Sequence, residues 1–185
     1  MVTLKSEDRQ PKNLDYASPT QFRFKVNKLP LTEFFIQSVN VPGVTLNEVT
    51  QPTSLAVVKI AGEGLEYEDL TVGFLVDENL NNFTEIYDWL KGLGFPQEHA
   101  QFTSLVNQAK ERFPTQGGSG GIYSDGTITI LTSKNNPVVE IRFRDLFPKN
   151  LASLQYTQDA TDVTYLTGSV TFGYKFYEIV HLPTK

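Results

Sequence analysis

The pentapeptide Gly117-Gly118-Ser119-Gly120-Gly121 is the part of the sequence that most resembles a catalytic motif. It fits the G-x-S-x-G pattern of a nucleophile elbow, and Asp125 and His181 follow in the chain order of hydrolase triads. An elbow needs a strand before the serine and a helix after it, because that strained turn presents the hydroxyl. Here Pro114 lies shortly before the motif and a Ser-Asp-Gly turn follows it. The context favours a glycine loop, with an esterase that uses Ser119 as the alternative.

The other groups that could do chemistry are two isolated histidines. Neither His99 nor His181 is followed, three or four positions further on, by the His, Asp or Glu of a helical metal site. Asp125-Gly126 lacks the preceding acids of a calcium loop, and the chain has no cysteine and no phosphate-binding or dinucleotide fingerprint. We therefore expect no catalytic residue, no metal ligand and no cofactor.

Composition and charge favour a single domain that is made in the cytoplasm. The chain has 185 residues and a net charge of -5, without an apolar leader or a stretch long enough to span a membrane. Eight acidic residues and no Lys or Arg lie between Lys59 and Lys91. Such a stretch repels phosphate, so tight binding to nucleic acid is not expected. The acids of residues 63–69 are more typical of a solvated turn than of a glycosidase pair.

Alternating apolar and polar residues predict a mainly β protein. We expect strands at residues 22–26 and 34–39, joined as a hairpin, and a type II turn at Pro42-Gly43. Residues 45–56 form an extended excursion with too few apolar residues for a core, and strands follow at 57–60 and 70–76. Further strands are predicted at 127–131 and 138–144, and residues 165–178 read as one closing strand of roughly 45 Å.

Two segments have the spacing of helices. Phe83, Ile86 and Leu90 recur on one face of a helix over residues 83–93, which Asn81 or Asn82 can cap. A second helix is predicted over residues 97–113, followed by the flexible connection 116–121. Residues 1–19 are polar and read as a loose arm before a domain at 20–185, with 97–123 as an elaboration.

Three stretches, in this order, give the chain a family resemblance. The first is the strand pair that ends at Val41-Pro42-Gly43, and the second is Lys59-Ile-Ala-Gly-Glu followed by residues 69–78 and the helix with Asp88-Trp89. The third is residues 139–151 with the closing aromatic strand. Together they cover most of residues 20–180, and in this respect the chain resembles the tail tube proteins of contractile-tailed (myovirus) bacteriophages.

The resemblance implies an antiparallel β-sandwich or barrel-like α+β fold with one flanking helix and a second helix. It implies hexameric rings that stack into a tube in the virion, assembled in the host cytoplasm, with sheath and baseplate or neck proteins as partners. DNA would pass through without specific binding. A contact loop to neighbouring subunits is expected at Val44, Leu46, Glu48, Val49, Gln51, Pro52, Leu55 and Val57. Lumen or ring-contact acids are expected at Glu63, Glu66, Glu68 and Asp69.

Two other functions fit the same sequence. A tube-initiating or tube-capping homologue at the baseplate or neck would share the fold and stop at a single ring. A carbohydrate-binding β-sandwich would use the closing strand, because Tyr165, Tyr174 and Tyr177 have rings that can stack on sugars.

Overall fold

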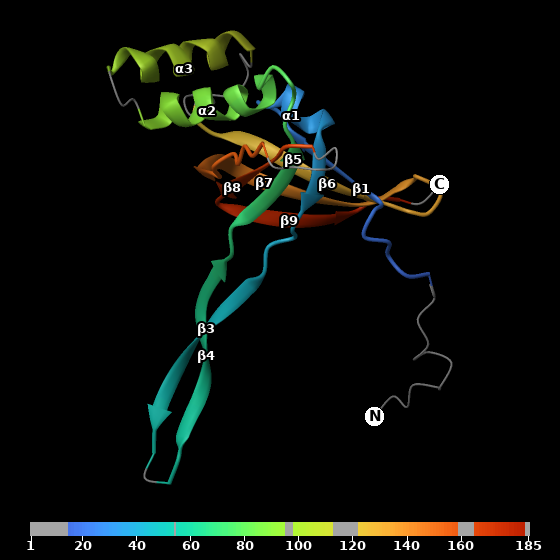
Figure 1. The fold of residues 1–185 in the computed structure, drawn as a ribbon. Coiled ribbons are helices and arrows are strands. Elements are labelled where there is room, and N and C mark those ends of the chain that lie inside the picture. Colours follow the sequence, from blue (N-terminus) through green and yellow to red (C-terminus); the bar gives the residue numbers. More distant parts are fainter. Residues whose placement is uncertain (1–14, 54, 95–97, 113–121, 159–164, 184–185) are drawn as a thin grey trace.

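The protein is described by a computed structural model over residues 15–53, 55–94, 98–112, 122–158 and 165–183. Figure 1 shows a bent β-sheet, two helices on one side of it and a long hairpin that projects away. None of the helices in these ranges is long and apolar enough to cross a membrane. The sheet has seven strands in the order β1-β6-β7-β8-β5-β2, with β9 also paired to β7. These strands are β1 (Phe22–Val26), β2 (Ile36–Val39), β5 (Leu70–Leu75), β6 (Ser124–Leu131), β7 (Pro137–Leu151), β8 (Thr167–Gly173) and β9 (Phe176–His181).

The first strand is where the alternation predicts it, but its partner is not the expected one. Phe24 and Val26 are buried, whereas Arg23 and Lys25 are exposed. β1 pairs antiparallel with β6, and β2 pairs antiparallel with β5, so the predicted hairpin of residues 22–39 is wrong. The reason is the short helix α1 (Pro30–Phe34), which Pro30 favours at its first turn and which separates the two strands.

The predicted closing strand is in fact two strands, because the sheet turns a corner there. β7 pairs with β9 from Val139 to Arg144 and with β8 from Phe147 onward. Between these stretches Asp145 has a φ of 55°, a left-handed conformation that bends the strand. The break at Tyr174 and Lys175 lies opposite this bend. The longest strand of the fold is therefore β7, with 15 residues.

The core lies between the bent sheet and helix α2 (Asn81–Gly94), the predicted first helix. Ile86 and Trp89 are the buried residues of the helix that belong to this core, and the Trp89 Nε1 donates a 3.0 Å hydrogen bond to the Ile122 carbonyl. The sheet contributes Phe24, Val26, Leu70, Val72, Phe74, Ile128, Ile141, Phe143, Leu146, Val170 and Phe172. The mainly β fold with flanking helices is therefore confirmed.

The second helix, α3 (Ala100–Arg112), is also confirmed and packs against α2. The two helices approach closely at Gly92, where an added Cβ would lie 3.0 Å from the Leu105 side chain. The glycine loop that contains Ser119 lies outside the described residues, as does most of the predicted N-terminal arm.

Candidate functional site

Strands β3 (Val44–Pro52) and β4 (Val57–Tyr67) form a hairpin that leaves the body of the protein (Figure 1). Within the residues that the structure describes, they pair only with each other. Every residue of β3 is exposed, and so is every residue of β4 except the half-buried Gly62 and Tyr67. An isolated two-stranded ribbon is at best marginally stable in water. This hairpin therefore has the character of a surface that another molecule covers.

The outer part of the hairpin has one mainly apolar face and one face that carries its charges, called here the polar face, on which Pro52 and Val57 also lie. Val49 lies opposite Ile60 and Gln51 opposite Val58, so these side chains share one face. Thr50 lies opposite Lys59, and Glu48 shares that second face. The Lys59 Nζ and Glu48 Oε1 are 2.7 Å apart. The charges of the outer hairpin therefore lie on one face, and Val49, Val58 and Ile60 are exposed on the other.

All eight residues of the predicted contact loop lie on this hairpin and are exposed. Leu55, at the turn, is 97% exposed, the highest value for an aliphatic side chain in the described chain. The sequence reasoning missed Val58, Ile60 and Leu65, which are also exposed and belong to the second strand. Their alternation with polar residues predicts a strand, but it does not indicate which face of that strand is exposed. Their contact role remains a prediction.

The base of the hairpin is held by an aromatic cluster of Tyr67, Phe143, Tyr174 and Tyr177. The ring centroids of Tyr67 and Tyr177 are 5.5 Å apart, and those of Phe143 and Tyr174 are 5.0 Å apart. The Tyr174 hydroxyl donates to the Glu68 carbonyl oxygen at 2.8 Å, and the Tyr177 hydroxyl donates to the Pro42 carbonyl oxygen at 3.2 Å. Burial, followed by its acidic and phenolic neighbours, raises the pKa of Tyr174 above its ordinary value. The closing strands thus anchor both ends of the hairpin.

Gly43 lies at the entry to the hairpin, and the type II turn predicted there is wrong. Its φ is not positive, and the segment has no turn assignment. Its amide donates to the Glu68 Oε2 at 3.2 Å, and its carbonyl oxygen accepts from the Glu68 amide at 3.0 Å. An added Cβ would lie 2.8 Å from the Glu68 carboxylate. A larger residue here would displace the flexible end of the exposed Glu68 side chain, and the backbone of Gly43 is held by these two hydrogen bonds and not by a turn.

The four predicted acidic candidates fall into two pairs with different surroundings. Glu63 and Glu66 are exposed on β4. Glu68 is held at the base by Gly43, and the Asp69 carboxylate forms an ion pair with the Lys149 Nζ at 2.7 Å. Glu68 and Asp69 are exposed as well, but each has a partner within the subunit, whereas Glu63 and Glu66 have no such contact in the described chain. No group of acids and histidines in the described ranges could hold a metal ion.

The residues of the hydrolase hypothesis do not come together where the structure describes them. Asp125 forms a 3.3 Å ion pair with Arg144, and His181 ends β9 opposite Val139. No hydrogen bond joins Asp125 to His181 in these parts of the chain. The His99 ring lies 5.8 Å from that of Phe102. Ser119 lies outside the described residues.

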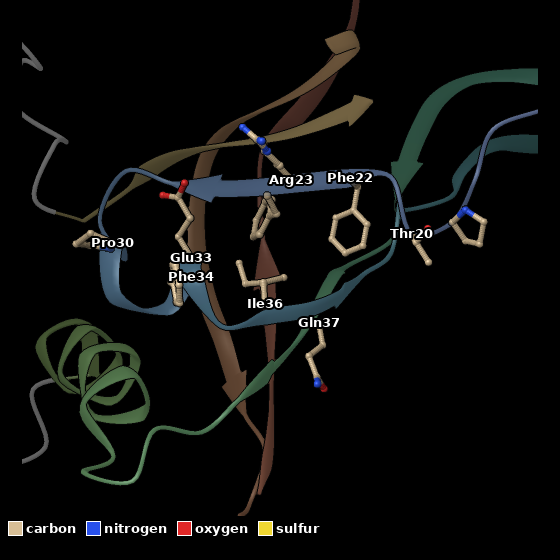
Figure 2. Close-up of a pocket in the computed structure, with 10 residues that line it drawn as sticks. Thr20, Phe22, Arg23, Pro30, Glu33, Phe34, Ile36 and Gln37 are labelled. Carbon is tan, nitrogen blue, oxygen red and sulfur yellow. The ribbon is translucent and has the colours of Figure 1, made fainter. Parts of the chain in front are cut away.

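A groove of about 670 Å³ lies between the edge strands β1 and β2 and is bordered by α1. Figure 2 shows Phe22 and Ile36 pointing into it from the two strands, while Arg23 and Gln37 point away. β1 bonds only to β6, and β2 only to β5, so the edges that face the groove are unpaired in the described chain. Unpaired edges are ready to accept another strand.

Comparison with known proteins gives this arrangement a context. The chain is 27% identical over 144 residues to the tail tube terminator protein of Enterobacteria phage T4, covering 75% of this chain and 73% of that protein. The solved anti-feeding prophage cap, described as a tube terminating cap, superposes with a TM-score of 0.62 at 11% identity over 96% of this chain and all of the other. The fold is that of proteins from contractile injection systems. A chain of the sheath-tube complex of an extracellular contractile injection system gives a TM-score of 0.57 at 13% identity, over 97% and 100% of the two chains. No protein-family model matches the chain.

Proposed function

We propose that this protein is a structural subunit that ends the tube of a contractile phage tail, as a ring of identical copies. The sequence relation to the T4 tail tube terminator supports this function, and so does the fold shared with a tube terminating cap. The relation spans about three quarters of each chain. The function is that of a scaffold and not of an enzyme.

The projecting hairpin is the observation that carries the proposal. A subunit that exposes Val49, Leu55, Val58 and Ile60 on a two-stranded arm gains stability when a neighbour covers them. The aromatic cluster at the base anchors this arm and sets its direction. An exposed arm with an anchored base suits a subunit that works by holding its neighbours.

The terminator is preferred to the main tube subunit that the sequence resemblance led us to expect. The named sequence relative is a terminator, and terminators share the tube fold. The main tube subunit remains the second candidate, because the similarity to the sheath-tube complex is nearly as high as that to the cap. A ring of main tube subunits accepts a further ring, whereas a terminator ring does not.

The number of copies, the partners and the location in this proposal are those that the resemblance to tail tube proteins implies. We place six copies in the ring, with the tube, sheath and neck proteins as partners, in a virion assembled in the host cytoplasm. DNA passes through without specific binding. Glu63, Glu66, Glu68 and Asp69 are all exposed and are the candidates for a lumen or ring contact, and Glu63 and Glu66 are preferred because they have no partner within the described subunit.

A sugar-binding function is disfavoured by the tyrosines that suggested it. Tyr174 and Tyr177 pack in the aromatic cluster and use their hydroxyls at the hairpin base. Tyr165 is exposed, but one ring does not make a platform. Binding of a stable monomer to a glycan array would restore this alternative.

Negative-stain electron microscopy of the purified protein over a range of concentrations tests the function. A terminator gives single rings that do not stack, whereas a main tube subunit gives tubes. Val58→Glu puts a charge on the apolar face of the hairpin and should abolish rings while leaving a folded monomer. Thr50→Glu also introduces a glutamate, but on the polar face, and serves as the matched control. A strict monomer under every condition, with or without tail tubes, would overturn the proposal.

A further inference from the structure

The groove between β1 and β2 is built to receive peptide backbone. The two strands end the sheet on either side, and their facing edges have no partner in the described chain. Phe22 and Ile36 point into the groove (Figure 2), and the polar residues Thr20 and Glu33 also line it. At its rim, Phe34 is 87% exposed. An apolar slot with free strand edges binds an extended segment by β-augmentation.

The outer part of the hairpin has an apolar surface that is complementary to this groove. Val49, Val58 and Ile60 form an apolar face, and Leu55 projects at the turn. In the groove, this face would meet Phe22 and Ile36, and the polar face would stay in water beside the outward-pointing Arg23. Inward apolar and outward polar side chains are the pattern of β1 itself.

Charge favours the same match. The outer face of β1 has Arg23 and Lys25, which are exposed and form no ion pair in the described chain. The hairpin as a whole has three acids and one Lys; Glu48 and Lys59 of its outer part are paired, so its net negative charge lies on Glu63 and Glu66, nearer its base. Oppositely charged surfaces steer association and fix its register.

In this contact, the hairpin and the groove belong to different subunits. No hairpin residue lines the groove of its own chain, and Figure 1 shows the hairpin extending away from the body. An arm on one surface and a slot on another form a heterologous contact, which generates rings when the rotation closes. We infer that the tip of the hairpin of one subunit docks in the β1–β2 groove of a second copy. The inference rests on the proposed self-assembly and names its contact.

Disulfide trapping tests this contact directly, because the natural chain has no cysteine. Leu55→Cys and Phe34→Cys are placed in separate proteins with tags of different size, mixed, and oxidised mildly. The expected product is the mixed Leu55–Phe34 dimer, at roughly fivefold or more over Leu55→Cys mixed with the control Tyr156→Cys, since disulfides form only between close Cβ atoms. Tyr156 is exposed like Phe34 but lies away from the groove lining.

A charge reversal adds a second measurement. Arg23→Glu should reduce the yield of the mixed dimer several-fold, whereas Lys134→Glu, the same charge change on an exposed turn, should leave it unchanged. Rings seen by microscopy without enrichment of the Leu55–Phe34 dimer would overturn the groove contact and leave the proposed function standing. Absence of both rings and mixed dimers, with or without tail tubes, would overturn both.

Discussion

The Tyr174 hydroxyl donates a 2.8 Å hydrogen bond to the carbonyl oxygen of Glu68, linking the break between the closing strands to the residue that follows β4. Tyr177 makes the corresponding bond to Pro42 on the entering chain. Both ends of the hairpin are therefore attached to two neighbouring aromatic side chains, Tyr174 and Tyr177. Its orientation depends on a few hydroxyl contacts as well as on the chain itself.

Tyr174→Phe should loosen this attachment without emptying the aromatic cluster. The ring stays, and the loss of one partly exposed hydrogen bond costs about 1 kcal/mol of unfolding free energy. Urea denaturation measures this cost, and hydrogen exchange at residues 66–70 should rise. Tyr156→Phe removes a hydroxyl from a ring that is 74% exposed and should change neither measurement. An equal effect of both variants would contradict the anchoring role.

The raised pKa of Tyr174 predicts a loss of stability in alkaline solution. The unfolded phenol ionises near its ordinary value of 10.0, whereas burial keeps the folded one protonated to higher pH. Above that value the unfolded state binds fewer protons, so the unfolding free energy falls as pH rises. The fall between pH 9 and 11 should be shallower in Tyr174→Phe than in the natural protein. Parallel slopes for the two proteins would show that Tyr174 does not contribute.

Asn82→Ala should destabilise the junction between β5 and α2. Asn82 is fully buried, its Nδ2 donates to the Leu75 carbonyl at 2.6 Å, and its Oδ1 accepts from the Phe83 amide at 2.9 Å. Truncation leaves buried groups without partners, at a cost of about 2–3 kcal/mol. Thermal denaturation should show a lower Tm. The neighbouring Asn81→Ala removes an exposed side chain and should cost clearly less.

Gly168→Ala should strain the core at the pairing of β8 with β5. An added Cβ would lie 2.7 Å from the Phe74 ring, which is fully buried and has little room to move. Overpacking of this kind costs about 1–3 kcal/mol. Gly94→Ala is the control, because nothing lies within 4 Å of its added Cβ. Equal unfolding free energies for the two variants would contradict the tight contact.

Local patterns in the sequence predict the elements better than their partners. The alternation at Phe24 and Val26 and the helical spacing of Ile86 and Leu90 are imposed by a single buried face, which leaves its period in the sequence. The partner of β1 is β6, far along the chain, and no local period specifies that pairing. The bend at Asp145 is likewise invisible, because a left-handed aspartate has no distinctive neighbours.

The first strand of the hairpin, β3, could be predicted from the sequence as part of the candidate site. Residues 45–56 stand out because they are extended but have too few apolar residues for a core, which is the pattern of the exposed β3. The separate surroundings of Glu66 and Glu68 were not predictable, since these residues differ only in how the chain turns back to Gly43 and Tyr174. The groove was also missed, because it is formed by two strands whose failure to pair depends on the distant β5 and β6.

The pairing of the sheet also determines when during synthesis each part can form. Phe22 pairs with Ile130 and Leu70 with Phe172, so the body must wait until nearly the whole chain has left the ribosome. The pairs of β3 with β4 are local and can form much earlier. The hairpin can therefore pair before Tyr174 and Tyr177, which hold its base, have been synthesised, and until then it is an isolated ribbon of marginal stability. Exposed apolar residues such as Val58 and Ile60 are then present during synthesis without the body, which is a risk for association of crowded nascent chains.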